Sequence, residues 1–273
     1  MSSILTNTSA MVALQNLKSI NMDLSKTQNE ISTGKSISSA SDNASMWAIS
    51  KVMESDVAGF SAISKSLALG ESTVAVAAAG ADKIVEILKE MKEKIVTTTG
   101  ENVDHANIAA DVTSLKDQVT SIIGAAQFNG KNLLDTAGGD MKVLSSLDRT
   151  SAAVTATSIT VKSVDFTTTL DMTTVDVADS TKANDSLIVV EALIKTAIEG
   201  AAALGSSKGH IEDQQKFISK LVDAMKSGIG ALVDANMEEA SARLQALQVQ
   251  QQLGTQSLSI ANKAPQMILQ LFK

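Results

Sequence analysis

Two histidines, His105 and His210, are the residues of this sequence best suited to metal binding or proton transfer. A protein metal site needs clustered ligands, such as two His residues four positions apart on a helix. The stretches HANIAAD and HIEDQQ supply no second His, and the sequence has no Cys and no H-E-x-x-H motif. The same scarcity of His argues against a Ser-His-Asp triad. We therefore predict no enzyme activity, no metal site and no cofactor.

Two glycine-containing stretches, AAAGADK and GAAALGSSKG, place Gly near Lys or Ser and raise the question of phosphate binding. Neither has the spacing of a Walker loop, and neither follows a predicted strand. They are better explained as helix-packing sites and helix breaks. The charged run LKEMKEK is typical of a solvated helix face with paired charges.

Composition narrows the functional classes further. The chain has 273 residues, a net charge of −7 and only 2% aromatic residues. An acidic chain does not attract nucleic acid or an anionic membrane. The N-terminus lacks the basic and apolar regions of a signal peptide, and no apolar stretch reaches the length of a membrane span. Much of the apolar content is Ala, Val, Leu and Ile, which suits long helices packed side by side.

The N-terminal half repeats apolar residues at alternating steps of three and four, which predicts three long helices. The first helix carries Leu14, Leu17, Leu24 and Ile31, and it ends at Thr33-Gly34-Lys35. Asp42 or Asn43 caps the second helix, whose stripe runs from Ile49 to Ile95 with an extra step of four between Gly59 and Leu67. The third helix extends from Ile108 to Ala126.

The middle of the chain changes character. Asn129-Gly130 predicts a turn, and the Thr- and Ser-rich stretch at about 141–178 predicts a small antiparallel β region. Asn184 and Asp185 are expected to cap the next helix, which breaks at Gly205–Gly209 before its repeat resumes. The predicted fold is mainly α: a long antiparallel helical bundle or coiled coil formed by both termini, with a small β-hairpin region between them.

The C-terminal helix has more apolar surface than one neighbouring helix can cover. At about 100° per residue, its apolar residues form two adjacent stripes that together span roughly 220°, whereas a surface helix needs about 100°. One stripe can pack on the N-terminal helix, and the simplest cover for the other is a second copy of the protein. The alternative is an intramolecular bundle core. The predicted interface residues of both termini are Leu14, Leu17, Leu24, Ile31, Leu244, Leu247, Val249, Leu253, Leu258, Ile260, Met267, Ile268 and Leu271.

At both ends the sequence resembles bacterial flagellin. The C-terminal signature of that family is matched by EEASARLQALQVQQQLGTQSLSIANKAPQMILQLFK. Four further stretches are similar to flagellin motifs: ILTNTSAMVALQNL, ISTGKSISSASDNASMWAIS, QFNGKNLL and LGSSKGHIE. The resemblance covers about residues 1–136 and 183–273 and is greatest to short alphaproteobacterial flagellins.

The resemblance implies a structural subunit that polymerises into the flagellar filament for swimming motility. It implies an inner domain of terminal helices, 1–42 plus 234–273, and a helical domain with a hairpin, 43–233, without outer variable domains. It also implies secretion through the flagellar type III export gate without a cleaved signal, and contact with an export chaperone, the filament cap and hook-associated proteins. Two alternatives stay open: a hook–filament junction protein, and a secreted monomeric adhesin or immune ligand.

The sequence departs from one motif of the family. Many flagellins carry a segment similar to LQRVRELAVQSAN that a Toll-like innate immune receptor recognises. The corresponding stretch here is LKEMKEKIVTTTG, starting at Leu88, in which Glu90 replaces the central Arg and Lys94 replaces an apolar Leu. Reversing a charge in a paired contact weakens binding strongly. We therefore expect weak or absent receptor activation.

Overall fold

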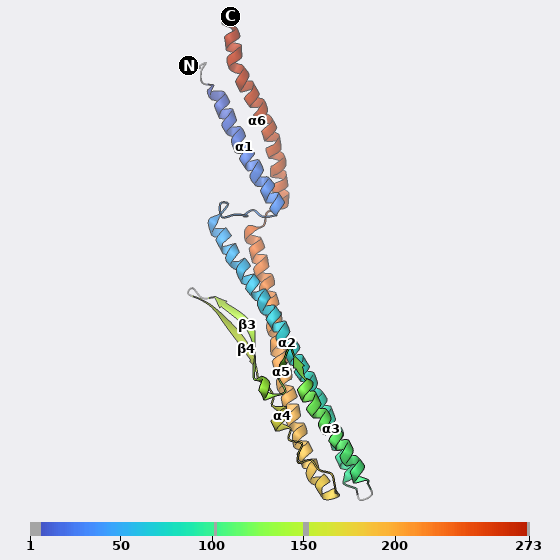
Figure 1. Cartoon of the computed structure of the whole chain (residues 1–273). Coiled ribbons are helices and arrows are strands. Elements are labelled where there is room, and N and C mark those ends of the chain that lie inside the picture. The colour runs from blue at the N-terminus through green and yellow to red at the C-terminus, as the bar shows by residue number, and fades with distance from the viewer. Residues whose placement is uncertain (1–6, 101–102, 150–152, 272–273) are drawn as a thin grey trace. The chain divides into compact units, whose positions relative to one another are not determined.

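The computed structural model describes the backbone of residues 7–100, 103–149 and 153–271, with side chains as far as residue 263. The chain forms mainly long helices with two short antiparallel strand pairs in its middle, as predicted (Figure 1). The chain divides into two compact units, Met1–Val57 with Ala224–Lys273, and Ala58–Asp223. The elements are α1 (Thr8–Thr33), α2 (Ala44–Thr98), α3 (His105–Ala125), β1 (Gln127–Phe128), β2 (Lys131–Asn132), η1 (Thr136–Gly138), β3 (Met141–Arg149), β4 (Val154–Val161), α4 (Phe166–Thr169), α5 (Ser180–Val233) and α6 (Met237–Leu271).

In the first unit, α1 and α6 lie side by side and run in opposite directions (Figure 1). The side-chain amide of Asn7 donates to the carbonyl of Ala261 over 2.7 Å, and Gln251 donates to the Asn21 side chain over 2.7 Å. These contacts join the start of α1 to the far part of α6, so the two ends of the described chain are neighbours.

Local signals set where the helices start and stop. The α1 helix ends at Thr33 because Gly34 adopts the left-handed conformation with φ of 70°, which favours glycine. The Asn43 side chain accepts from the amide of Met46 at the start of α2, so Asn43 is the cap. Asp42 instead accepts hydrogen bonds from Ser38 and Ser39, which fold the preceding loop and hold the pKa of Asp42 below its ordinary value.

The core of the second unit follows the predicted stripe of α2. From Ile63 to Ile95 its members are buried, as are residues of α3 and α5 such as Val119 and Ile211. The members of the same stripe at the start of α2, Ile49 and Val52, are about half exposed and belong to the first unit.

The β3–β4 hairpin packs against α2 at two glycines. A Cβ atom at Gly59 would lie 2.7 Å from Leu147, and one at Gly70 would lie 2.6 Å from Val143. The hairpin register shifts between Leu144 and Ser146, and Gln214 of α5 donates to the Ser145 carbonyl over 2.9 Å. Missing side chains on α2 therefore let the hairpin approach it, and α5 holds the irregular point of β3.

The sequence predictions require three corrections in this region. The α5 helix starts at Ser180, where the Asp179 side chain accepts from the amide of Lys182, so Asn184 and Asp185 lie inside the helix and do not cap it. The helix continues through Gly205–Gly209 without a break. The strands end at Val161, and most of the stretch up to residue 178 is loop with one short helix.

Gly70→Ala is expected to destabilise the second unit by about 1–3 kcal/mol, because the added methyl group overlaps Val143 and displaces the hairpin. Urea unfolding followed by circular dichroism, with hydrogen exchange of the β3 amides, measures this effect. Gly205→Ala is the matched control, since a Cβ there meets no atom within 4 Å. That change should stabilise α5 by about 1 kcal/mol. Equal stabilities for the two variants would contradict the assigned packing.

Candidate self-assembly surface

The inner faces of α1 and α6 are the two sides that face each other. On α6 the central residue of this face is Leu247, which is buried, and Gly254 lets the Leu17 side chain approach to 3.1 Å from where a Cβ would lie. On α1 the centre is Thr27, which is only 2% exposed. The inner face of α1 consists of Leu17, Ile20, Leu24, Thr27 and Ile31, and that of α6 consists of Leu244, Leu247, Gln251, Gly254, Leu258 and Ala261.

The predicted stripe of α1 differs from this inner face at one member. Leu14 is exposed and lies roughly 100° around the helix from the centre of the inner face, while Ile20 and Thr27 occupy inward positions that the sequence reasoning did not select. Leu17, Leu24 and Ile31 are seven residues apart. A step of three followed by a step of four fills each interval at Ile20 and Thr27, and this alternation is the signal that could have identified them.

The open face of α6 is the apolar stripe that no part of the described chain covers. Val249, Leu253 and Ile260 are between 55% and 69% exposed. At about 100° per residue they lie roughly 150° around the helix from the inner face. The α6 helix therefore has two apolar faces on nearly opposite sides. The side chains of Met267, Ile268 and Leu271 lie outside the described residues.

The open face of α1 consists of Met11, Val12, Leu14 and Met22, which are between 57% and 64% exposed. At about 100° per residue, Met11 and Met22 lie nearly opposite the inner face, and Val12 and Leu14 lie on either side of them. Further exposed apolar side chains of the same unit lie at the start of α2 and at the first residue of α6, namely Met46, Ile49, Val52 and Met237.

Charge is absent along the open face of α6. The sequence from Leu244 to Asn262 contains no Asp, Glu, Lys or Arg, although Gln and Ser are frequent. The charged residues of the helix flank this stretch: Arg243, which pairs with Glu239 at 2.8 Å, precedes it, and Lys263 follows it. Depletion of charge is typical of the centre of protein interfaces, so the open face has the composition of a contact surface.

A hydrogen-bonded joint connects the two helix breaks of the first unit. The amide of Ser36 donates to the Val233 carbonyl over 2.7 Å, and the amide of Ala235 donates to the Gly34 carbonyl over 2.9 Å. Lys35 adds an ion pair with Glu54 at 3.5 Å. The ends of α1 and α5 are thus bound to each other at the level where both helices stop.

The segment that replaces the receptor motif lies on α2 in the second unit. Leu88 is fully buried in the core, whereas Glu90 is exposed to solvent. The Lys94 ammonium pairs with the Asp111 carboxylate of α3 at 2.7 Å. The hydrogen bond to Asp111 raises the pKa of Lys94, so this side chain remains charged at neutral pH.

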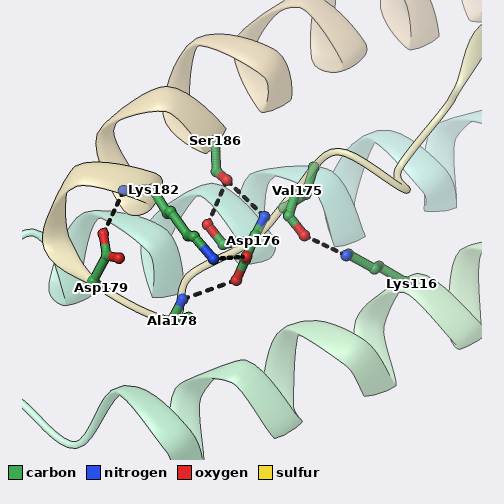
Figure 2. A network of polar contacts seen from close by, with 7 residues as sticks. All are labelled: Lys116, Val175, Asp176, Ala178, Asp179, Lys182 and Ser186. Carbon is green, nitrogen blue, oxygen red and sulfur yellow. Dashed lines mark hydrogen bonds and ion pairs between the residues drawn. The ribbon is translucent and has the colours of Figure 1, made fainter.

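A polar network in the second unit offers the densest set of charged groups away from the terminal helices (Figure 2). Lys116 of α3 donates to the Val175 carbonyl over 2.5 Å, and Lys182 pairs with Asp176 at 2.7 Å. The hydrogen bonds from Lys182 and from the Ala178 amide lower the pKa of Asp176. Desolvation lowers the pKa of Lys116.

This network is structural. The Ser186 hydroxyl, which is buried, accepts from the Asp176 amide over 2.8 Å and donates to the Asp176 carbonyl over 2.6 Å (Figure 2). The neighbouring side chains Val175 and Val177 are buried, so the polar groups anchor the loop before α5. An open cavity of about 690 Å³ beside Lys116, Asp135 and Phe166 lies next to it. Among the described residues no three His, Cys, Asp or Glu side chains gather to hold a metal ion.

Ser186→Ala is expected to cost about 1–3 kcal/mol of unfolding free energy, because the Asp176 amide and carbonyl lose their partner. Ser207→Ala is the control, since that hydroxyl bonds only to the Ala203 carbonyl within α5. The control should change stability by less than about 0.5 kcal/mol. Chemical denaturation of the two purified variants gives both values, and a Ser186→Ala variant as stable as the control would refute the anchoring role.

None of the described helices is long and apolar enough to cross a membrane. The geometry defines a mainly helical protein whose terminal helices α1 and α6 form one pair, with apolar faces that the described chain leaves uncovered.

Comparison with known proteins places this class within one family. The sequence matches the bacterial flagellin N-terminal helical region over residues 4–138 and the bacterial flagellin C-terminal helical region over residues 187–272. The chain belongs to the bacterial flagellin family. The matched ranges agree closely with the resemblance found in the sequence motifs.

Several relatives match along the whole chain, and two of them illustrate the likeness. A flagellin of Brucella melitensis biotype 1 is 43% identical over 281 aligned positions, covering 100% of both chains. Flagellin FljM of Caulobacter vibrioides is 37% identical and covers 100% of this chain and 99% of its own. Both organisms are alphaproteobacteria, as the resemblance of the sequence motifs predicted.

A solved structure shares the fold at low sequence identity. A Vibrio parahaemolyticus protein provisionally assigned as a flagellar hook-associated protein has a TM-score of 0.56 and 14% identity. The match covers 71% of this chain and 100% of that one. At this identity the likeness concerns the fold alone, so the full-length relatives decide between the two flagellar classes and favour flagellin.

Proposed function

We propose that this protein is a structural subunit that polymerises into the bacterial flagellar filament for swimming motility, with its terminal helix pair as the contact surface. Membership of the flagellin family supplies the class of function. The observation that supports the contact surface is the uncharged open face of α6, where Val249, Leu253 and Ile260 are exposed.

Burial of the open faces supplies the driving force for assembly. Apolar area removed from water contributes about 25 cal/mol per Å², and complete burial of one Leu or Ile side chain contributes about 1.5–3 kcal/mol. Ordering a chain end opposes this by about 1–2 kcal/mol per residue. Several apolar residues must therefore be buried together, which makes the terminal helices act as one unit that completes its folding on assembly.

Leu253→Asp or Ile260→Asp should abolish polymerisation, because each places a carboxylate in the apolar contact, where an unpaired buried charge is strongly unfavourable. Seeded filament growth, followed by negative-stain electron microscopy, measures the effect. Gln248→Asp is the matched control, since it adds the same charge to α6 at an exposed position roughly 120° around the helix from the open face. It should elongate seeds nearly as well as the unmodified protein. Circular dichroism should show residues ~44–232 folded in all three variants. Normal filaments from either apolar variant would show that the contact surface is assigned wrongly.

The finer partners rest on the family. The proposed partners are other flagellin copies, the filament cap, hook-associated proteins, and the export chaperone and export gate. The proposed location is the extracellular filament, reached by type III export without a cleaved signal. We propose no catalytic activity, no nucleic-acid binding and no membrane insertion, in keeping with a structural protein.

The alternatives predict different behaviour in the same assay. A hook–filament junction protein adds to an end in few copies and does not elongate seeds. A secreted monomeric adhesin or immune ligand stays monomeric, with both ends protected from trypsin. Continuous growth on seeds distinguishes the proposed function from both.

We expect weak or no activation of the Toll-like receptor that recognises many flagellins. Glu90 presents a negative charge where those flagellins have Arg, and Lys94 is charged and paired with Asp111 where they have an apolar Leu. In a cell reporter assay the unmodified protein should give a signal far below that of an activating flagellin. The double variant Glu90→Arg/Lys94→Leu should increase the signal. It changes only one solvent-exposed ion pair, worth up to about 1 kcal/mol. A strong signal from the unmodified protein would refute the expectation.

A further inference from the structure

The exposed methionines of this chain are confined to one of its two compact units. The sequence has 11 Met and no Cys, so thioethers are its only sulfur groups. Among the described side chains, the exposed thioethers are those of Met11, Met22, Met46 and Met237, and all four belong to the first unit. In the second unit, by contrast, Met91 is completely buried, and Met141 and Met172 are only partly exposed.

Two of the four lie on the proposed contact surface, and the other two are exposed elsewhere in the same unit. Met11 and Met22 belong to the open face of α1, together with Val12 and Leu14. Met46 lies one turn before Ile49 on the exposed side of α2, and Met237 begins α6. Flexible, polarisable thioethers suit irregular contacts between copies. The same exposure makes them accessible to oxidants before assembly.

Oxidation changes such a residue from apolar to polar. The thioether sulfur attacks one oxygen of hydrogen peroxide, the O–O bond breaks, a sulfur–oxygen bond forms, and water leaves. Sulfur is oxidised to a sulfoxide while the peroxide is reduced to water, so the reaction needs no other reactant. The sulfoxide is polar and chiral, and specific reductases convert it back to the thioether. Burying it without a hydrogen-bond partner is unfavourable.

We infer that Met11, Met22, Met46 and Met237 form an oxidation-sensitive modification site that controls assembly. Peroxide converts them to sulfoxides in the free subunit and thereby blocks its addition to a filament, whereas burial in the filament protects them. This inference rests on the proposed function, because it assumes that the open faces become buried on polymerisation. With no thiol in the chain, peroxide has no more reactive sulfur group to oxidise first.

The test treats free subunits with hydrogen peroxide, removes the oxidant, and measures elongation of untreated seeds. Peptide mass spectrometry should find sulfoxide at Met11, Met22, Met46 and Met237, while Met91 stays reduced as an internal standard. Elongation by the oxidised subunit should fall about tenfold or more, since each buried sulfoxide weakens the contact. Treatment with the two methionine sulfoxide reductases should restore it. Oxidised subunits that elongate seeds at the untreated rate would overturn the inference.

Two further measurements separate the possible results. The variant Met11→Leu/Met22→Leu/Met46→Leu/Met237→Leu keeps the surface apolar and should elongate seeds before and after peroxide. If it loses growth after peroxide, other residues are responsible and the inference is wrong. If this variant fails to assemble at all, reductase rescue of the unmodified protein decides the question.

Intact filaments should form sulfoxide at the four positions at least about tenfold more slowly than free subunits. Untreated subunits that do not elongate seeds would contradict the proposed function instead.

Discussion

The terminal helices α1 and α6 can each cover only one of the other's apolar faces. Their inner faces meet around Thr27 and Leu247, which leaves Val249, Leu253 and Ile260 in contact with water. A larger apolar face on α1 could not cover both apolar faces of α6, because these two faces point in nearly opposite directions. Pairing α1 with α6 therefore does not bury all of their apolar surface. It leaves a surface that another copy of the protein can cover.

The second unit differs, since it has a core that is covered within the chain, although side chains such as Leu69, Ile188 and Phe217 stay exposed. The stripe of α2 from Ile63 to Ile95 is buried, and Gly59 and Gly70 admit the hairpin side chains Leu147 and Val143. The loop before α5 is fixed by the Ser186 hydroxyl and by Lys116. A chain with a buried core in one unit and an open surface in the other can fold that core before assembly and still retain a driving force for assembly.

Sequence reasoning recovered features that depend on short-range chemistry. The stop at Gly34, the cap at Asn43 and the turn at Asn129-Gly130 each follow from one or two residues, and the buried stripe of α2 follows from spacing. It failed where distant contacts override local preference. Gly205 remains helical because the packed residues on both sides of it, Leu204 and Ile211, continue the same buried stripe. Spacing alone also does not say which side of α1 meets α6, so it did not separate the exposed Leu14 from Leu17 on the inner face.

The hairpin has a further consequence for how sequences of this kind can grow longer. Arg149 of β3 and Val154 of β4 are paired partners at the tip of the hairpin, the end at which the chain connects the two strands. Additional residues inserted between them would begin and end at adjacent points. Such an insertion would leave the length and register of every helix unchanged, including the helix pair whose faces are left open. Diversity of chain length can therefore accumulate at this tip without changing the helix pair whose apolar faces are left open.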